Sequence, residues 1–212
     1  MSAVPAAPDQ TVHVVDDDEA LRDSLAWMLE ANGHAVVAHE SGEAFLAACT
    51  PGMTGCVLLD VRMPGMSGLE VFEELGRRRC GLPVVFITGH GDVPMAVSAL
   101  KQGAVDFVEK PFGEREMLRV VEQCLRLERE TRDRRLQEAD TARRLEQLTQ
   151  REREVLELII VGKLNKQIAD VLGISIKTVE VHRARVMEKM GAHSLAELVQ
   201  HVVALEPGAA MR

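Results

Sequence analysis

Hydrophobic and polar positions follow different patterns in the front and the back of the chain. In the front, five short apolar runs alternate with five longer stretches in which apolar residues recur every three or four positions. Gly, Pro or Asn stands at most of the joins, as expected for turns between separate elements. The predicted strands are residues 12–15, 35–38, 56–59, 84–88 and 105–108. The predicted helices are residues 19–32, 43–48, 68–78, 93–103 and 114–127.

This alternation predicts an α/β fold for the front part. Strands that alternate with helices form a parallel sheet, because each helix carries the chain back across one face to start the next strand. We therefore expect a doubly wound parallel sheet of five strands, of the flavodoxin-like kind, with helices on both faces. In such sheets, ligands bind beyond the carboxyl ends of the strands.

The back part has helical periodicity throughout and predicts an all-α domain of four helices. These helices are residues 150–161, 165–172, 176–190 and 195–205. "TQRE" at 149–152 and "SLAE" at 194–197 match the capping box, which satisfies free N–H groups at a helix start. Gly173 suits a helix C-cap, and Ser175 suits the next N-cap. Two short helices joined by a tight glycine turn predict a helix-turn-helix, so we expect this domain to bind DNA.

Between the two parts, residues 128–146 read "ERETRDRRLQEADTARRLE", a charged stretch without Gly or Pro that we interpret as a solvated helical linker. The leucines at 127, 136, 145 and 148 are spaced too widely for a heptad, so a coiled coil has little support. The predicted organisation is a flexible tail at 1–10, the α/β domain at 11–127, the linker at 128–147, the DNA-binding domain at 148–206 and a tail at 207–212.

The composition is that of a globular protein, with 46% hydrophobic and 27% charged residues. No apolar run approaches the roughly 18 residues that cross a bilayer, and "MSAVPAAPDQ" lacks the basic start and apolar core of a secretion signal. The four cysteines show no C-x-x-C spacing, and we interpret them as core residues or free thiols in a reducing cytoplasm. Net charges of −9 for 1–127, 0 for 128–147 and +1 for 148–212 indicate different partners for the two ends.

Three carboxylates are expected at one edge of the predicted sheet. Asp16 and Asp17 follow the first strand, and Asp60 follows the third. Carboxylates at the ends of core strands repel one another and are costly to desolvate, unless a cation offsets their charge. Mg²⁺ prefers oxygen ligands and keeps several waters, so this cluster predicts a magnesium site. For Asp16 and Asp17 alone, the simpler interpretation would be two solvated loop residues.

A hydroxyl and an ammonium join these acids at the same edge. Thr88 ends the fourth strand, and Lys110 follows the fifth, directly before Pro111. Such a pair could bind a tetrahedral dianion. Each residue alone has an ordinary explanation, as a strand-end residue or a surface charge. The combination of acids, hydroxyl and lysine at successive strand ends is what indicates a site.

Several stretches of the chain, taken together, match a known family. They are "TVHVVDDDEALRDSLAWML", "LLDVRMPGMSG", "VVFITGHGDVPMAV" and "GAVDFVEKPF" in the front, and "LTQREREVLELIIVGKLNKQIADVLGISIKTVEVHRARVMEKM" in the back. On these stretches the chain resembles the bacterial two-component response regulators of the FixJ type, which join a receiver domain to a LuxR-type helix-turn-helix. The resemblance covers residues 11–205. Similar patterns occur in regulators of tetrathionate respiration and of aromatic-compound breakdown, so the resemblance does not define the controlled genes.

The resemblance implies a phosphorylation site at the acidic cluster. Asp60 would accept the phosphoryl group from a phosphohistidine of a sensor histidine kinase. Asp17, Asp60 and the backbone carbonyl of Arg62 would bind Mg²⁺, the one cofactor expected, and Asp16 would act mainly through water. Phosphorylation would favour a homodimer and DNA binding.

The resemblance also implies how the phosphoryl group is detected. Thr88 would bond its oxygens, and Lys110 would pair with them. Phe107 occupies the family's aromatic switch position, although by pattern alone it is a core strand residue. The Lys110–Pro111 peptide bond is expected to be cis. We expect the dimer to form through the predicted helix 93–103 and the strand that follows it.

The helix at 176–190 is the expected DNA-reading element. Val179, Val186 and Met190 share one face and should pack inward. Recognition helices usually read bases with their N-terminal half. The candidate contacts are Asn165, Lys166, Lys177, Thr178, Glu180, Val181, Arg183, Ala184, Arg185 and Lys189. Glu180 could accept a hydrogen bond from a cytosine amino group, or it could be an ordinary solvated acid.

Three alternatives have less support. A metal-dependent aspartyl phosphatase typically needs a second acid two residues after its nucleophile, where this chain has Arg62. A P-loop is absent, because the closest match, "GISIKT", has Ile176 where Gly is needed. The complete set of acids, threonine and lysine argues against a vestigial receiver. The expected protein is therefore a cytoplasmic regulator rather than an enzyme, with a sensor kinase, promoter DNA and RNA polymerase as partners. By analogy alone we favour activation.

Overall fold

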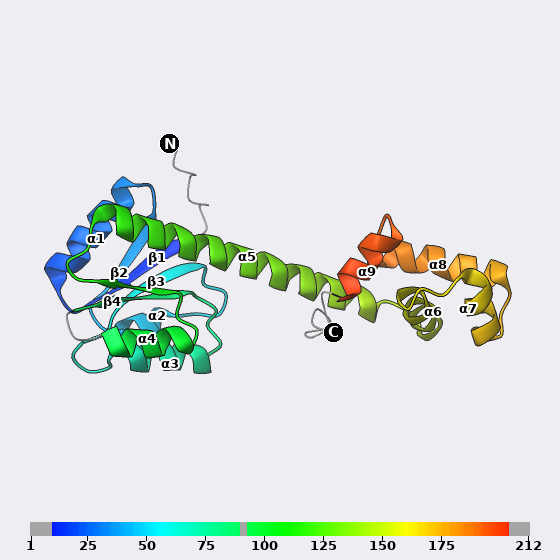
Figure 1. Cartoon of the computed structure of the whole chain (residues 1–212), viewed down its shortest axis with the longest axis horizontal. Helices are drawn as coiled ribbons and strands as arrows, with labels where there is room; N and C mark the ends of the chain where they lie inside the picture. The colour runs from blue at the N-terminus through cyan, green and yellow to red at the C-terminus, as the bar shows by residue number, and fades with distance from the viewer. Residues whose placement is uncertain (1–9, 90–92, 204–212) are drawn as a thin grey trace. The chain divides into compact units, whose positions relative to one another are not determined.

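The computed structural model describes residues 10–89 and 93–203 of the chain. It divides the protein into two compact units, Met1–Thr131 and Arg132–Arg212. Figure 1 traces the helices and strands of each unit along the sequence. Among the described helices, none combines the length and the apolar character that crossing a membrane requires.

The first unit is built on a parallel sheet with the strand order β2-β1-β3-β4-β5. The strands are β1 (Thr11–Val15), β2 (Ala35–His39), β3 (Gly55–Asp60), β4 (Val84–Thr88) and β5 (Asp106–Glu109). This order confirms the doubly wound, flavodoxin-like sheet. It also places β1 and β3 side by side at the centre, so the residues at their carboxyl ends meet.

Helices cover both faces of the sheet (Figure 1). They are α1 (Glu19–Ala31), α2 (Gly42–Ala48), α3 (Gly68–Arg77), α4 (Val93–Lys101) and α5 (Glu114–Glu146). One core joins α1 and the first half of α5 to the sheet, through residues such as Leu29 and Val121. The other joins α2 and α3 to the opposite face, through residues such as Phe45, Val71 and Phe86. The sheet between two apolar layers explains why its central strands are continuous apolar runs.

The strand β3 carries Asp60 to the edge of the sheet. All six of its residues are buried, and Asp60 is the last of them rather than the residue after the strand. α3 begins close by, at Gly68, where a Cβ atom would lie 2.2 Å from the carbonyl oxygen of Asp60. Only glycine lets the helix approach the strand end this closely. The N–H of Gly68 donates a hydrogen bond to the carbonyl oxygen of Val61, at 3.0 Å.

In the described residues of the second unit, four helices follow the end of α5. They are α6 (Gln150–Ile160), α7 (Asn165–Leu172), α8 (Ile176–Met190) and α9 (Leu195–Val203). One apolar core joins all four. Val179, Val186 and Met190 are buried in this core, as the helical spacing predicted.

Most of the predicted helix ends are confirmed. Thr149 and Glu152 form the reciprocal capping box at the start of α6. Gly173 ends α7 in the left-handed conformation, with φ 65°, which glycine adopts without strain. The hydroxyl of Ser175 accepts a hydrogen bond from the N–H of Thr178 and caps α8.

The second predicted capping box is formed differently. The hydroxyl of Ser194 accepts a hydrogen bond from the N–H of Glu197, at 3.2 Å. The carboxylate of Glu197 accepts from the N–H of His193, at 2.8 Å, rather than from that of Ser194. The carboxylate therefore stabilises the turn one residue earlier than the motif predicts.

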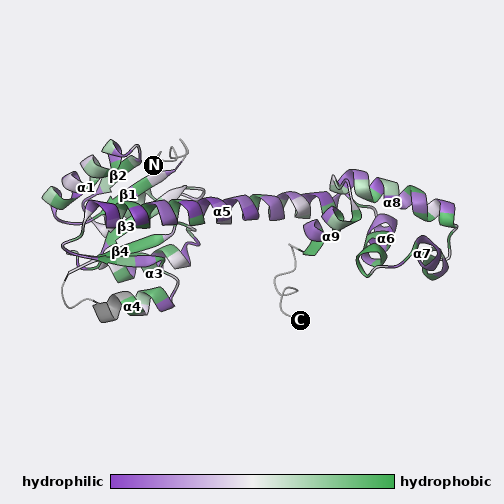
Figure 2. Ribbon diagram, turned by 45° about the horizontal axis from the view of Figure 1, so that its top comes forward, coloured by the Kyte–Doolittle hydropathy of each residue, from purple (hydrophilic) through white to green (hydrophobic). Residues whose placement is uncertain are grey.

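The helix α5 differs from the prediction in its extent. The helix predicted at 114–127 and the helical linker predicted at 128–147 are one uninterrupted helix, Glu114–Glu146. Figure 2 shows that α5 is mostly hydrophilic, in contrast to buried strands such as β4, which are mostly hydrophobic. No Gly or Pro occurs between 114 and 146, so nothing in the sequence ends the helix at 127.

Gln10, the last residue of the predicted flexible tail, is packed against the first unit. Gln10 is 2% exposed, and its side chain donates a hydrogen bond to the carbonyl oxygen of Leu125, at 2.8 Å. Arg129 donates to its amide oxygen, at 2.9 Å. Gln10 thus belongs to the packed first unit. The rest of that tail, the C-terminal tail and the last two residues of the helix predicted at 195–205 lie outside the described residues.

Candidate functional site

Residues from three strand ends form a cluster at the carboxyl edge of the sheet. Asp16 follows β1, Asp60 ends β3, and Lys110 follows β5. Lys110 Nζ lies 2.9 Å from Asp16 Oδ2 and 2.7 Å from Asp60 Oδ1. The two acids are 0% and 6% exposed, so one ammonium is shared between two buried carboxylates. The strand order brings these residues together, as the sequence predicted.

The backbone holds the remaining carboxylate oxygens in place. Asp60 Oδ2 accepts a hydrogen bond from the N–H of Arg62, at 2.9 Å, and Asp16 Oδ1 accepts from the N–H of Asp18, at 2.8 Å. The Lys110–Pro111 peptide bond is cis, as expected. The N–H of Lys110 donates to the carbonyl oxygen of Thr88, at 2.7 Å, which ties the lysine to the end of β4.

The cluster contains more negative than positive charge. Burial is the largest influence on Asp60 and raises its pKa, and the bonds from Lys110 counter this only in part while Asp16 adds to it. For Lys110, burial lowers the pKa, but the hydrogen bonds to Asp60 and Asp16 outweigh it and hold the pKa above its usual value. A further cation would relieve the excess of negative charge.

The oxygen atoms of this edge suit a hard cation. Among the described residues, no three His, Cys, Asp or Glu side chains form a ready-made metal cage. Mg²⁺ does not need one, because it binds through one or two carboxylates and keeps several waters. Asp16 and Asp60 are buried carboxylates at this edge, the exposed Asp17 directly follows Asp16, and Arg62 follows Asp60 by two residues with its own carbonyl oxygen. The residues present fit the predicted magnesium site.

Thr88 and Phe107 lie on the two strands beyond β3. Thr88 is 0% exposed, and within the described part of the chain its hydroxyl oxygen has no hydrogen-bond partner. An unpaired buried hydroxyl is unfavourable, so it marks a position where a new acceptor would be stabilised. Phe107 is half-buried and packs against the core on the α2–α3 face.

Two residues that shape the site were not predicted from the sequence. Gly68 allows α3 to start against Asp60, and Glu43 on α2 accepts a hydrogen bond from the N–H of Met66, at 2.8 Å. Glu43 therefore anchors the loop between β3 and α3, which carries Arg62. The spacing of glycines in "MPGMSG" could have indicated a close approach, but no local signal pointed to Glu43.

The second unit gathers most of the predicted DNA contacts on α7 and α8. Asn165, Lys166, Glu180 and Arg183 line one cavity of about 530 Å³. On α8, the exposed residues include Lys177, Glu180, Val181, Ala184 and Arg185, while Thr178 and Arg183 are half-buried. By helical spacing, Lys177, Val181, Ala184 and Arg185 lie on the side of α8 away from its buried residues, whereas Arg183 lies beside the buried face.

Lys189 is an exception among these residues. Its ammonium donates to Glu152 Oε2, at 2.7 Å, and to the carbonyl oxygen of Gln147, at 3.1 Å. Glu152 is only 2% exposed, so the pair joins α8 to the start of α6. These contacts inside the domain compete with a DNA contact of Lys189, which stays a prediction.

Two family models match the chain. "Response regulator receiver domain" matches residues 12–122, which contain the acidic cluster, and "Bacterial regulatory proteins, luxR family" matches residues 146–202. The first match alone covers more than half of the chain, and its bounds agree with the described sheet and helices.

Individual relatives match over nearly the whole length. The transcriptional regulatory protein FixJ of Azorhizobium caulinodans is 50% identical over 89% of this chain and 90% of its own. The structure of the response regulator StyR has a TM-score of 0.82 and 45% identity, covering 92% of this chain and 98% of that chain. Full-length FixJ from B. japonicum has a TM-score of 0.59 and 42% identity, covering 94% and 98%. The chain therefore belongs to the FixJ-type two-component response regulators, in which a receiver domain is joined to a LuxR-type DNA-binding domain.

Proposed function

We propose that Asp60 accepts a phosphoryl group from the phosphohistidine of a sensor histidine kinase. The observation that carries this proposal is the position of Asp60 beside Asp16 and Lys110 at the carboxyl edge of the sheet. A carboxylate oxygen of Asp60 attacks the phosphorus atom while the bond from phosphorus to the imidazole nitrogen breaks. The products are an acyl phosphate on Asp60 and a free histidine on the kinase.

The reaction needs in-line positioning and neutralisation of charge more than covalent help. Lys110 already contacts Asp60 and is placed to pair with an oxygen of the incoming group. Asp17, Asp60 and the carbonyl oxygen of Arg62 would hold Mg²⁺, with Asp16 acting through water, and the bound ion would supply the remaining positive charge. The protein thus assists its own phosphorylation without being a conventional enzyme.

We infer that Thr88 and Phe107 detect the product. A phosphoryl group adds roughly 1.5 to 2 negative charges and three strong acceptor oxygens. The buried hydroxyl of Thr88 would gain an acceptor, and its movement toward the phosphoryl group would free space for Phe107. The rearrangement would alter α4 and β5, and this face would then bind a second copy of the chain. Shifting a two-state equilibrium from 1:99 to 99:1 takes about 5.5 kcal/mol, which several charge-assisted contacts and dimerisation together can supply.

We further propose that the dimer binds two half-sites in double-stranded promoter DNA through α8. Lys177, Thr178, Val181, Ala184 and Arg185 would enter the major groove, while Asn165, Lys166 and Arg183 would contact phosphates. Glu180 would accept from a cytosine amino group. The net charge of only +1 for 148–212 supports binding as a dimer, because a nearly neutral domain has little non-specific affinity for DNA. The protein would act in the cytoplasm, as an activator that works with RNA polymerase.

Sedimentation velocity with Mg²⁺ and beryllofluoride, which mimics the phosphoryl group, tests these steps together. Wild type and Asp60→Ala are compared with and without beryllofluoride. We expect a monomer-to-dimer shift in wild type alone, accompanied by tighter binding to promoter DNA. A shift of equal size in Asp60→Ala would refute the assignment of Asp60. No shift in wild type even at high concentration would refute dimerisation, and a DNA titration on the same samples would then show whether activation occurs without it.

A further inference from the structure

The four cysteines of the chain fall into two different environments. Cys56 on β3 and Cys124 on α5 are 0% exposed in the apolar core. Cys49 and Cys80 are half-buried near the surface, and their Sγ atoms lie 3.0 Å apart. No feature of the phosphorylation site or of the DNA-binding surface uses this second pair.

Both of these cysteines are held at helix ends by backbone hydrogen bonds. Cys49 is the C-cap residue of α2, and its N–H donates to the carbonyl oxygen of Phe45, at 2.9 Å. Cys80 follows α3, and its N–H donates to the carbonyl oxygen of Leu75, at 3.0 Å. Arg79, directly before Cys80, has a φ of 53°, in the left-handed region that non-glycine residues rarely adopt. Proximity of the thiols therefore follows from the ends of two packed helices rather than from one mobile loop.

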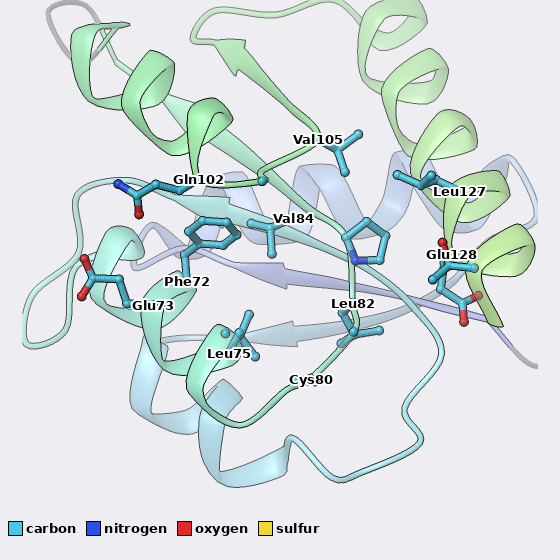
Figure 3. A pocket seen from close by; sticks show the side chains of 15 residues that line it. Phe72, Glu73, Leu75, Cys80, Leu82, Val84, Gln102, Val105, Leu127 and Glu128 are labelled. Carbon is cyan, nitrogen blue, oxygen red and sulfur yellow. The ribbon is translucent and has the colours of Figure 1, made fainter. Parts of the chain in front are cut away.

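Cys80 borders a groove on the surface of the first unit. It is one of the residues that line a groove of about 470 Å³ beside α3 and the start of β4 (Figure 3). Three arginines precede it, Arg77, Arg78 and Arg79, and all three are exposed. Arg77 and Arg78 both pair with Glu74, but the three arginines exceed that one acid and attract anionic molecules, among them oxidised glutathione with its free carboxylates.

We propose that Cys49 and Cys80 form a reversible disulfide bond by exchange with a small disulfide such as oxidised glutathione. The thiolate of Cys80 attacks one sulfur of glutathione disulfide, and one glutathione thiolate leaves. The thiolate of Cys49 then attacks the Cys80 sulfur of the mixed disulfide, and the second glutathione leaves. Two protein thiols are oxidised, one glutathione disulfide is reduced to two glutathione thiols, and the two thiol protons pass to the leaving thiolates.

The order of attack follows from the surroundings of the two thiols. Burial, together with the contact with Cys80, raises the pKa of Cys49 to about 12, so its thiolate is scarce at neutral pH. Cys80 lines the groove and Cys49 does not, so a reagent in the groove meets Cys80 first. Cys49 serves as the resolving thiol, whose high pKa is offset by its position next to the sulfur that it must attack. Exchange is accordingly slow and depends on the proximity of the pair.

The bond would stabilise the receiver without touching its phosphorylation site. Cys49 and Cys80 lie at the amino ends of β3 and β4, whereas Asp60 lies at the carboxyl end of β3. The closed loop contains the whole of β3 and α3, so the bond would restrict the unfolded chain strongly. The structure thus assigns to this edge a redox-dependent change of stability in a domain whose chemistry takes place at the opposite edge.

Thiol counting on the full-length wild-type protein tests the proposal without any substitution. The protein is equilibrated with oxidised glutathione, quenched in acid, unfolded and alkylated, and the labelled cysteines are mapped by mass spectrometry. We expect two of the four cysteines to lose reactivity and a linked peptide pair that contains Cys49 and Cys80. Oxidation should raise the melting temperature of the receiver by roughly 5–10 °C, and dithiothreitol should reverse the rise.

Single substitutions supply the matched controls. In Cys49→Ser, the exchange should stop at the mixed disulfide of Cys80 with glutathione. In Cys80→Ser, Cys49 should stay reduced. Neither variant should show the rise in melting temperature. Phosphorylation of Asp60 should proceed at the same rate in oxidised and reduced wild type. Four thiols that all remain alkylatable in wild type would overturn the proposal, as would a linked pair that includes Cys56 or Cys124 or a stable adduct that never resolves.

Discussion

Two lysines, one in each unit, bind a buried carboxylate at the same distance, yet the pKa values of the two carboxylates shift in opposite directions. Lys110 Nζ lies 2.7 Å from Asp60 Oδ1, and Lys189 Nζ lies 2.7 Å from Glu152 Oε2. Burial nevertheless raises the pKa of Asp60, whereas the hydrogen bond from Lys189 and that from the Thr149 N–H lower the pKa of Glu152 to about 2.

Burial is the first difference, because it raises the pKa of Asp60 more than the bonds from Lys110 lower it, and the number of acids per lysine is the second. The carboxylate of Glu152 accepts hydrogen bonds from Lys189 and from the N–H of Thr149 and, among the residues that the structure describes, shares neither with another acid, so its charge is compensated. Asp60 shares Lys110 with Asp16, and the cluster is left with an excess of negative charge. The first pair is a completed structural interaction. In the second, the negative charge is only partly compensated. A site that must bind a cation and a phosphoryl group requires this, since functional sites often give up stability.

The largest expected effect separates the two lysines by chemistry. Lys110→Met should slow phosphorylation of Asp60 by about 10²–10³-fold, because a positioned charge that meets the transferred group is removed. Lys189→Met should leave the rate within about twofold, because its charge is used in the other unit. Intact mass spectrometry during incubation with a small phosphoryl donor and Mg²⁺ measures both rates. A strongly reduced phosphorylation rate in Lys189→Met, or a wild-type rate in Lys110→Met, would contradict this comparison.

The next largest effect concerns the unfolding free energy, to which Lys189 contributes through its pair with Glu152. Lys189→Met leaves the 2% exposed Glu152 without its cation, and we expect the second unit to lose about 2 kcal/mol of unfolding free energy. This value lies below that for a fully buried pair because the Lys189 side chain is 33% exposed. Urea unfolding measures the loss, and Glu152→Gln, which removes the charge from the other side, should give a similar value. If the double variant showed the full sum of the two losses, the pair would carry no coupling.

The two units should also respond to acid at different pH values. His13 and His39 are buried with their ring nitrogens 3.2 Å apart, and burial, followed by the charge of His39, lowers the pKa of His13 to about 4. His13 in the unfolded chain takes up a proton near pH 6.5, so its stabilising contribution is complete above that pH and is lost as the pH falls toward 4. At pH 5 the first unit should have lost about 2 kcal/mol.

The second unit should keep its ion pair over the same range. The contribution of Glu152 is complete above its unfolded pKa near 4.5 and is lost only as the pH falls from there toward 2. Hydrogen exchange at pH 7 and pH 5, corrected for intrinsic rates, resolves the two units. His13→Leu, which cannot titrate, should remove most of the pH dependence of the first unit. Equal weakening of both units at pH 5 would contradict this account.

The site of Lys110 could be predicted from the sequence, whereas the role of Lys189 could not. Apolar runs mark the strands, and the topology of a doubly wound sheet brings the ends of β1, β3 and β5 to one edge, so the contacts of Asp16, Asp60 and Lys110 follow from local patterns. The contact of Lys189 depends on how α8 packs against α6. Helical periodicity only says that Lys189 is not on the buried face.

The same reasoning explains the other differences from prediction. Gln10 binds the backbone of α5 more than a hundred residues away, and Glu43 binds a loop that follows another strand. Both contacts join distant segments through polar groups, which carry no periodic signal. The continuity of α5 was predictable in principle, because the charged stretch contains no helix-breaking residue, but its many charged residues favoured a separate solvated linker.

The smallest expected effect concerns two threonines, one at the phosphorylation site and one at a helix cap of the second unit. They extend the comparison of an incomplete interaction with a completed one. The hydroxyl of Thr88 is buried and, within the described residues, has no hydrogen-bond partner, whereas that of Thr149 accepts from the N–H of Glu152, at 3.3 Å. Thr88→Val removes an unpaired polar group and keeps the shape, so the first unit should gain about 1 kcal/mol of unfolding free energy.

Thr149→Val instead removes a helix cap and should cost the second unit about 1 kcal/mol. Urea unfolding in the absence of phosphoryl donors measures both changes, and beryllofluoride then separates stability from function. Thr88→Val should still bind beryllofluoride but dimerise less, whereas Thr149→Val should dimerise normally. Destabilisation by Thr88→Val would mean that its hydroxyl is already satisfied in the resting protein. In that case the unfavourable feature of the site would be the charge excess around Asp60. The Thr88 hydroxyl would then not be an unpaired donor that gains its acceptor from the phosphoryl group.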